Sequence, residues 1–239
     1  MFCYRDMTFC TYYKDCDDEK DCHRKLTPEV NEGIIMKKVF IDCGANDGCS
    51  IELFRKHYPN ANEYEIHSFE PNPLFKEKLQ SLNVNYYEAA ISTADGIHNF
   101  YLDQWYEKDV YTHFGSTLMR EKISKKGCPV QEIKVQGIDF SKWILNNFSI
   151  NDYIVLKMDV EGAEYVILKK MINDGSLDYI NVIYIEFHGR KFIIHEQEMY
   201  EDSINQSYLN EMKKRNIEIF NGSGKWNTIR DTLEINNKD

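Results

Sequence analysis

Acidic and imidazole side chains stand directly after two predicted strands in the second half of the chain. The apolar run Tyr153–Met158 is followed by Asp159 and Glu161. The next apolar run ends in Glu186 and His188, again two residues apart. Because residues two apart in an extended chain point to the same side, each strand presents its pair on one face. Neighbouring strands lie about 4.8 Å apart, so the two pairs can converge into one cluster.

This predicted cluster has the side chains needed to remove a proton from a hydroxyl group. A carboxylate or imidazole can act as a general base, and a metal ion can lower the pKa of the hydroxyl instead. We expect Asp159, Glu161 and His188 to be catalytic. We also expect Asp159, Glu186 and His188 to be candidate ligands of Mg2+ or Mn2+, with the imidazole favouring Mn2+ or metal-free catalysis. The alternative is that Glu164 and Glu186 are helix or rim carboxylates and that His188 is a loop residue.

A glycine-bracketed loop follows an earlier predicted strand. Its sequence runs from Asp42 through Gly44 to Gly48 and leads into a helix predicted to begin at Ser50. Strand, glycine-rich turn and helix in this order hold nucleotide-like ligands in doubly wound α/β proteins. The third glycine of a dinucleotide fingerprint is missing, and the loop has no Lys or Arg to hold a phosphate. An acid before such a loop suits a ligand that carries an ammonium group, such as S-adenosylmethionine (SAM).

A second carboxylate, Glu70, ends the alternating run that begins at Tyr64. A carboxylate at the tip of the second strand accepts hydrogen bonds from both ribose hydroxyls in folds of this kind. Glu70 lies roughly 20–30 residues past the glycine loop, as a βαβ unit requires. Its alternative role is to cap the helix that follows, since carboxylates favour helix N-termini. The pairing with the glycine loop favours ligand binding.

Several motifs together make the chain resemble the FkbM family of SAM-dependent methyltransferases over roughly residues 36–190. The most specific of them is the segment Lys157–Glu164, which reads D-x-E-G-x-E after its first two residues. Asp47 departs from the family, because many members carry an apolar residue there. The other matching motifs are Asp42–Gly48, Phe69–Pro73, Ala89–Ser92, Gly137–Asp139 and Ile185–His188.

The resemblance implies a class I methyltransferase that uses SAM, and usually methylation of a hydroxyl on a sugar, a glycan or a secondary metabolite. The chain is accordingly expected to be an O-methyltransferase whose partner is a small-molecule or glycan acceptor. The expected cofactor-binding residues lie in the matching motifs: Asp42, Gly44, Ala45, Asn46, Gly48, Ser50, Glu70, Pro71, Asn72, Ala90 and Asp159.

Predicted strands and helices alternate from residue 39 to residue 187, as in a doubly wound α/β domain. With the resemblance, this order implies a Rossmann-like class I sheet of seven strands, mostly parallel with an antiparallel edge. Ile217–Phe220 and Trp226–Ile235 are expected to supply that edge after a helix at Glu198–Lys214. The remaining expected elements are helices at Ser50–Tyr58, Pro73–Leu82 (burying Leu74), Asp139–Asn147 and after Gly162, and strands at Val84–Ile91, Ile97–Leu102 and Gln131–Gln136.

The long stretch Asp103–Pro129 between two of these strands has no regular pattern. Loops of this length in compact domains are usually functional lids or mobile segments. We expect Tyr101–Pro129 to form the acceptor wall, together with the tail beyond Phe192. Its aromatic side chains could stack on sugar faces or pack as a small core of their own: Trp105, Tyr106, Tyr111, His113 and Phe114.

Composition narrows the class of partner. The 239 residues carry a net charge of −10 with a pI near 5.2, which argues against nucleic acid, because phosphates are bound by clustered Lys and Arg. No apolar run approaches the ~20 residues of a membrane span, and no signal peptide is visible. We therefore expect a soluble cytoplasmic protein. The sequence does not indicate an oligomeric state.

The first 35 residues hold four of the seven cysteines and are expected to form a separate Cys-rich segment before a methyltransferase domain at 36–239. Clustered thiols in a cytoplasmic protein suggest a metal, here zinc. The spacings of seven, six and six lack the usual C-x2–4-C pair, so free thiols are the favoured alternative. The candidate zinc ligands are Cys3, Cys10, Cys16 and Cys22, with His23 as a substitute for the last.

Other classes of protein share parts of this pattern. A nicotinamide dehydrogenase uses the same fold, but it needs the missing third glycine and a catalytic pair that is not evident. A protein arginine methyltransferase also places acids after the fourth strand, but it needs a double-glutamate loop that is absent. A non-catalytic SAM-binding module stays open as an alternative.

Overall fold

The computed structural model describes residues 37–103, 106–107, 110–111, 115–120, 130–189 and 198–221. The predicted strand Trp226–Ile235, the side chains of the aromatic acceptor wall and the candidate zinc ligands lie outside these residues. The candidate zinc ligands that lie outside them are Cys3, Cys10, Cys16 and Cys22. Within the described residues, no helix is both long enough and apolar enough to cross a membrane.

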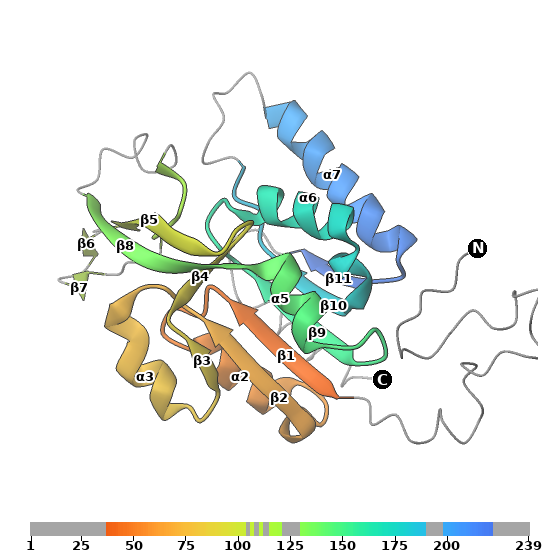
Figure 1. The fold of residues 1–239 in the computed structure, drawn as a ribbon, viewed down its shortest axis with the longest axis horizontal. Coiled ribbons are helices and arrows are strands. Elements are labelled where there is room, and N and C mark those ends of the chain that lie inside the picture. The colour runs from red at the N-terminus through yellow and green to blue at the C-terminus, as the bar shows by residue number, and fades with distance from the viewer. Residues whose placement is uncertain are drawn as a thin grey trace, which may run out of the picture. The chain divides into compact units, whose positions relative to one another are not determined.

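A six-stranded parallel sheet forms the centre of the described domain, with strand order β11-β10-β9-β1-β2-β3 (Figure 1). Its four inner strands are mostly buried, as expected for a parallel sheet covered on both faces, whereas the residues of the edge strands β3 and β11 are half-buried or exposed. The strands are β1 (Lys38–Cys43), β2 (Tyr64–Phe69), β3 (Asn85–Tyr87), β9 (Tyr153–Met158), β10 (Ile180–Ile185) and β11 (Glu218–Asn221).

Helices cover both faces of this sheet, so the doubly wound α/β prediction is confirmed. Alternate residues of each strand point to opposite faces. In β1, Val39 and Ile41 pack in the cluster that contains helices α5, α6 and α7, whereas Phe40 packs against α2 and stacks on Phe54 with ring centroids 3.9 Å apart. The helices are α2 (Cys49–His57), α3 (Lys76–Ser81), α5 (Phe140–Asn147), α6 (Glu164–Asp174) and α7 (Glu198–Lys214), with short 3-10 turns η2 (Ala61–Glu63), η3 (Pro73–Phe75) and η4 (Ser176–Tyr179).

A second sheet of three strands, in the order β4-β8-β5, lies beside the end toward which β1 points (Figure 1). The predicted strand pair on either side of the 103–129 stretch is confirmed, because β5 and β8 pair antiparallel. The predicted strand Val84–Ile91 is divided: its first part, β3, joins the main sheet and its second part, β4, pairs with β8. The strands are β4 (Ala89–Ser92), β5 (Gly96–Asp103) and β8 (Val130–Asp139), and a further antiparallel pair is β6 (Tyr106–Glu107) and β7 (Val110–Tyr111).

The edge of the main sheet differs from the sequence prediction. The strand expected at Ile217–Phe220 is present as β11, but it runs parallel to β10 and not antiparallel. The physical reason is α7, which carries the chain back along the sheet so that the next strand starts from the same end. The antiparallel partner and the seventh strand were expected from Trp226–Ile235, which is not described.

Two local predictions are also corrected. The first helix was expected to begin at Ser50, but α2 begins at Cys49 after a left-handed Gly48 (φ 81°), and the Ser50 hydroxyl donates to Asp42. Leu74 was expected to be buried but is 62% exposed, because a 3-10 turn precedes α3 and changes the face that Leu74 occupies. The helix expected at Asp139–Asn147 is confirmed as α5, and Asp139 is its N-cap, since its side chain accepts a hydrogen bond from the Lys142 amide.

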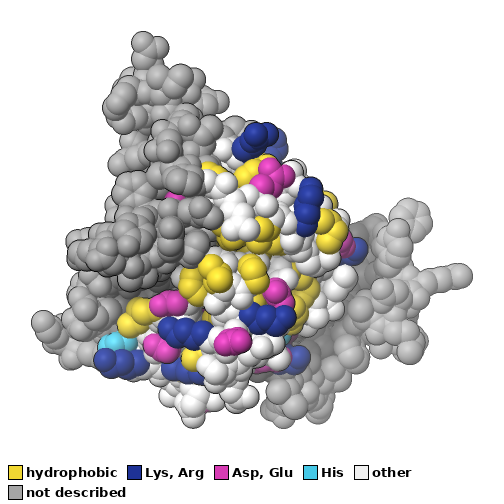
Figure 2. Space-filling model, turned by 90° about the vertical axis from the view of Figure 1, so that its left-hand side faces the viewer, with side chains coloured by type: hydrophobic (Ala, Val, Ile, Leu, Met, Phe, Trp, Pro, Cys, Tyr) yellow, Lys and Arg dark blue, Asp and Glu magenta, His cyan; other side chains and the backbone are white. Residues whose placement is uncertain are grey.

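The side of the molecule that carries the three-stranded sheet and α3 has mixed charge. On this face Lys and Arg side chains are interleaved with Asp and Glu side chains rather than gathered in one block (Figure 2). Among the described residues of this face there is therefore no broad basic surface of the kind that binds a phosphate backbone.

Candidate active site

A cavity of about 410 Å3 lies at the carboxyl end of the central strands and is closed on one side by the three-stranded sheet. This volume falls within the range of small-molecule sites, roughly 300–1,000 Å3. Ligands of open parallel sheets bind at this edge. The lining residues are Gly44, Ala45, Asn46, Asp47, Cys49, Ser50, Phe69, Glu70, Pro71, Ala89, Ala90, Ile91, Phe100, Ser116, Leu118, Lys157, Asp159, Val160, Glu161 and Glu186.

Most residues predicted to bind a cofactor come together around this cavity. Three do not line it: Asp42 is completely buried, Gly48 packs against α3, and Asn72 is 1% exposed with its side chain accepting from the Leu74 amide. The predicted residues that do line the cavity are Gly44, Ala45, Asn46, Ser50, Glu70, Pro71, Ala90 and Asp159.

The glycine loop is fixed by the neighbouring strands on both sides. The amides of Gly44 and Ala45 both donate to the Phe69 carbonyl, at 3.0 and 3.1 Å, and the Asp159 amide donates to the Cys43 carbonyl at 3.1 Å. Gly44 has φ 80°, and a Cβ placed there would lie 1.9 Å from the Asp159 carbonyl oxygen. The sequence predicted that this loop holds a ligand. The structure shows that glycine is also needed at position 44 for close approach to the backbone of Asp159.

Glu70 joins the glycine loop to the tip of β2. Its carboxylate accepts hydrogen bonds from the Asn46 and Asn72 amides, both at 2.8 Å. The residue is 6% exposed, and this burial raises the pKa of Glu70 to about 7, although the two amide hydrogen bonds act to lower it. The following turn is capped by Asn72, so the predicted alternative in which Glu70 caps it does not describe the structure.

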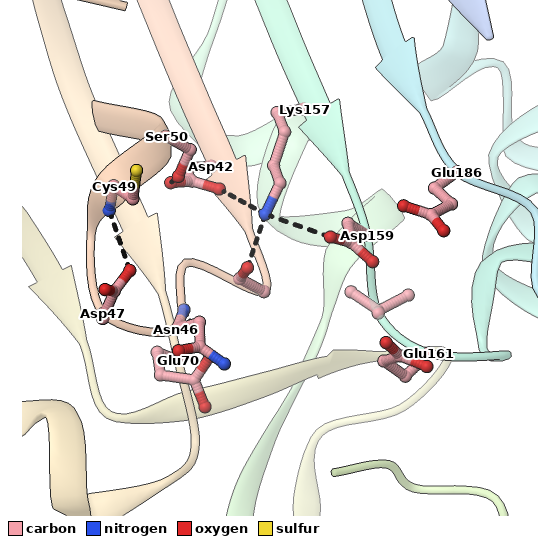
Figure 3. A network of polar contacts seen from close by, with 12 residues as sticks. Asp42, Asn46, Asp47, Cys49, Ser50, Glu70, Lys157, Asp159, Glu161 and Glu186 are labelled. Atoms are coloured by element: carbon pink, nitrogen blue, oxygen red, sulfur yellow. Dashed lines mark hydrogen bonds and ion pairs between the residues drawn. The ribbon is translucent and has the colours of Figure 1, made fainter. Parts of the chain in front are cut away.

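A buried lysine connects the loop with β9 (Figure 3). Lys157 Nζ lies 3.0 Å from Asp42 Oδ1 and 3.8 Å from Asp159 Oδ2, and it donates to the Gly44 carbonyl. The hydroxyl of Ser50 donates to the other oxygen of Asp42. Burial alone would lower the pKa of Lys157, but Asp42 and Asp159 raise it, so the side chain stays a cation.

The sequence analysis missed Lys157 as part of the site. The available signal was a single charged residue within the apolar run of β9. A charge buried in a strand needs a partner, and the register of parallel pairing places Asp42 directly opposite Lys157. That register is a property of the sheet and is not visible in the local sequence.

The acidic and imidazole groups after β9 and β10 converge, as the spacing predicted. His188 Nε2 lies 3.4 Å from Oε1 of Glu186, and 3.6 Å from both Oδ1 of Asp159 and Oε1 of Glu161. Its Nδ1 lies 2.8 Å from an oxygen of Glu164, a completely buried carboxylate for which the sequence suggested only the alternative role of a helix or rim carboxylate.

This arrangement sets the protonation of the imidazole. Burial alone would lower the pKa of His188, but hydrogen bonds with Glu164 and Glu186 raise it to about 10. His188 is therefore an imidazolium near neutral pH. Burial also raises the pKa of Asp159, although Lys157 and His188 act in the opposite direction.

Glu161 and Thr117 form a contact that the sequence analysis did not predict. Glu161 has a left-handed backbone (φ 59°), which is uncommon for a residue with a side chain. The Thr117 hydroxyl donates to the Glu161 carbonyl at 2.8 Å, and the backbone of Thr117 pairs with Tyr101 of β5. The second sheet thereby supports the turn that carries Glu161.

The donor atoms of Asp159, Glu161 and His188 lie within 4.8 Å of one another, a spacing that could hold a metal ion. The predicted ligand set had Glu186 in place of Glu161. Glu186 does not belong to this group, although its carboxylate lies 3.4 Å from His188 Nε2. Imidazole and carboxylate oxygens together suit Mn2+ or another divalent cation.

Comparison with known protein families matches the chain to the Methyltransferase FkbM domain over residues 42–215. The matched range begins at the end of β1 and includes the glycine loop, Glu70, Lys157, and the groups after β9 and β10. No curated protein matches the chain.

Proposed function

Because the chain belongs to the FkbM methyltransferase family, we propose that it transfers a methyl group from SAM to a hydroxyl oxygen of a sugar, a glycan or a secondary metabolite. The observation that carries this proposal is that one cavity is bordered by the glycine loop, by Glu70 and by the carboxylates of the His188 cluster. A cofactor site and a proton-accepting site are therefore next to each other.

The proposed cofactor position follows from the lining of the cavity. Glu70 accepts the ribose hydroxyls, since each carboxylate oxygen has a lone pair left after its amide hydrogen bond. Apolar side chains of β2 and the second sheet, including Phe69 and Ile91, suit the flat face of an adenine ring. When bound, SAM supplies an electrophilic methyl group on a sulfonium.

The proposed chemistry is an in-line displacement in which the acceptor oxygen bonds to the methyl carbon and the carbon–sulfur bond breaks. The proton of the hydroxyl passes to a carboxylate, for which Asp159 is best placed, because burial has moved its pKa toward neutral pH. His188 is already protonated and does not serve as the first base. It holds the surrounding carboxylates together, and its position is fixed through Glu164.

A metal-assisted route is the second candidate for activating the hydroxyl. Glu164 binds Nδ1 of His188 and leaves Nε2 facing Asp159 and Glu161, as carboxylates that orient metal-ligating histidines do. In this route Asp159, Glu161 and the neutral His188 would hold a divalent cation, which would lower the pKa of the hydroxyl.

Calorimetric titration with SAM, with NAD as the control ligand, tests the cofactor. We expect binding of SAM and not of NAD, and the reverse result would contradict the proposal. Transfer of radiolabelled methyl from SAM onto a panel of sugars and glycans tests the acceptor class. Labelling of peptides alone would favour the protein methyltransferase alternative, and binding without transfer to any acceptor would favour a SAM-binding module.

Chelator treatment separates the two routes of hydroxyl activation. Loss of transfer that Mn2+ or Mg2+ restores would support the metal-assisted route. Unchanged transfer in the presence of chelator would support Asp159 acting as a base.

A further inference from the structure

We propose that Lys157 is a positioning residue that ties the cofactor loop to Asp159, so that SAM affinity and methyl transfer depend on one buried cation. The inference rests on the proposed function, because it concerns how the same cavity holds SAM. It assigns to Lys157 a role beyond the stability of the sheet.

The contacts of Lys157 join three separate segments of the chain. Its Nζ lies 3.0 Å from Asp42 at the end of β1 and 3.8 Å from Asp159 after β9, and it donates to the carbonyl of Gly44 in the loop. Figure 3 shows Asp42 and Asp159 on opposite sides of the ammonium, with Asp159 on the side toward Glu186. One side chain therefore sets the position of both the loop and the proposed base.

The sheet dictates this location. Val155 packs against the α2 face, and Lys157, two residues later, points to the same face. Parallel pairing places Lys157 opposite Asp42, whose second oxygen is held by Ser50 of α2. The ammonium can then reach the loop only at the end of β1, where the carbonyl of Gly44 turns toward it.

The loop between Cys43 and Asn46 depends on this contact for its conformation. The amides of Gly44 and Ala45 bind the Phe69 carbonyl, and the amide of Asn46 binds Glu70. The carbonyl of Gly44 is held by Lys157. Loss of the ammonium would remove one of the two hydrogen bonds that hold the peptide unit between Gly44 and Ala45, so the loop groups that face the cavity would be held less firmly.

A role limited to fold stability does not explain this arrangement. Lys157 is 2% exposed, and burying a charged pair costs about as much as its attraction returns, so an apolar pair at this position would stabilise the sheet equally well. Lys157 nevertheless lines the cavity. The charged pair is then explained by the hydrogen bond that the ammonium donates to the Gly44 carbonyl and by its ion pair with Asp159.

Replacement of Lys157 by Met, with and without replacement of Asp42 by Asn, tests the inference. In K157M we expect the affinities for SAM and for S-adenosylhomocysteine to fall by the same factor, about tenfold or more, because the loop and not the sulfonium is affected. Turnover should also fall at saturating SAM, because Asp159 loses one of the two cations that position it and keeps only His188 of that pair. Lys142→Met, at an exposed lysine paired with Asp95, is the matched control and should bind SAM as the wild type does.

The double variant D42N/K157M separates positioning from stability. It leaves no lone buried charge, so its melting temperature should recover toward that of the wild type, while SAM affinity should stay about tenfold weaker or worse. Recovery of both properties, or wild-type SAM affinity in K157M, would overturn the inference. A double variant that does not fold would also overturn it, by showing that the fold itself needs the pair. Failure of the wild type to bind SAM would instead count against the proposed function.

Discussion

Glu70 has a structural role in the glycine loop beside the role in ligand binding that we propose for it. Its two oxygens hold the amides of Asn46 and Asn72, and the carboxylate still lines the cavity. Its position at the tip of β2 was predictable from the alternating run before it. Its contact with Asn46 was not, because that contact depends on how the glycine loop folds back over β2.

The raised pKa of Glu70 gives a stability prediction with a definite sign. Its ordinary pKa is 4.5, and burial raises it to about 7 in the folded protein. The folded state therefore binds the proton more tightly, so this contribution to stability is present below pH 4.5 and is lost as pH rises through 7. We expect the free energy of unfolding to fall by up to about 3 kcal/mol across that window on account of Glu70.

Urea unfolding of the protein without ligand, at several pH values, measures this effect. Glu70→Gln cannot ionise, so the part of the pH slope that belongs to Glu70 should be absent in that variant. Parallel slopes in the wild type and in Glu70→Gln between pH 4.5 and 7 would show that Glu70 ionises normally.

Gly44 gives a second prediction at the residue scale. Gly44→Ala places a Cβ 1.9 Å from the Asp159 carbonyl at a left-handed position, so the loop or β9 must move. We expect a lower melting temperature and loss of most SAM affinity. Gly96→Ala is a useful control for the loss of glycine alone, because its φ is 133° but a Cβ there meets nothing within 4 Å. Equal effects of the two substitutions would contradict the role of the Asp159 contact.

At the scale of elements, the apolar patterns predicted where strands and helices lie better than they predicted which partners they take. β9 was expected at Tyr153–Met158 and α7 at Glu198–Lys214, and both have these bounds. The division of Val84–Ile91 between two sheets was not predictable, because Ala89–Ser92 pairs with β8, some forty residues later. The direction of β11 was wrong for a related reason, since it follows from the path of α7.

The link between the second sheet and the site can be tested at Thr117. Thr117→Val keeps the shape of the side chain but removes the hydroxyl that donates to the Glu161 carbonyl. We expect a loss of about 1–3 kcal/mol in unfolding free energy and a reduced turnover number, because Glu161 would relax from its left-handed backbone. Thr117→Ser retains the donor and should keep most of the turnover. If Thr117→Val and Thr117→Ser have the same turnover, the hydroxyl does not support Glu161.

At the scale of the whole molecule, the matched family range and the described cavity coincide. The match covers residues 42–215, and the described segments that line the cavity begin at Gly44 and end at Glu186. The charged side chains that line the cavity include a cation, Lys157, as well as carboxylates. The sequence had predicted that the ligand binds at a loop without Lys or Arg. That expectation is correct for the loop itself, and the cation instead comes from β9.

The central claim is that Glu70 and Asp159 do different work in one cavity, and paired measurements on two variants test it most directly. The SAM dissociation constant and the rate of methyl transfer would be determined for Glu70→Ala and Asp159→Asn. We predict that Glu70→Ala loses about 2–4 kcal/mol of SAM binding, because a buried carboxylate that accepts two hydroxyls is removed. Asp159→Asn should bind SAM nearly as the wild type does, yet transfer methyl at least about a hundredfold more slowly. Wild-type SAM affinity in Glu70→Ala, or wild-type transfer in Asp159→Asn, would contradict the account.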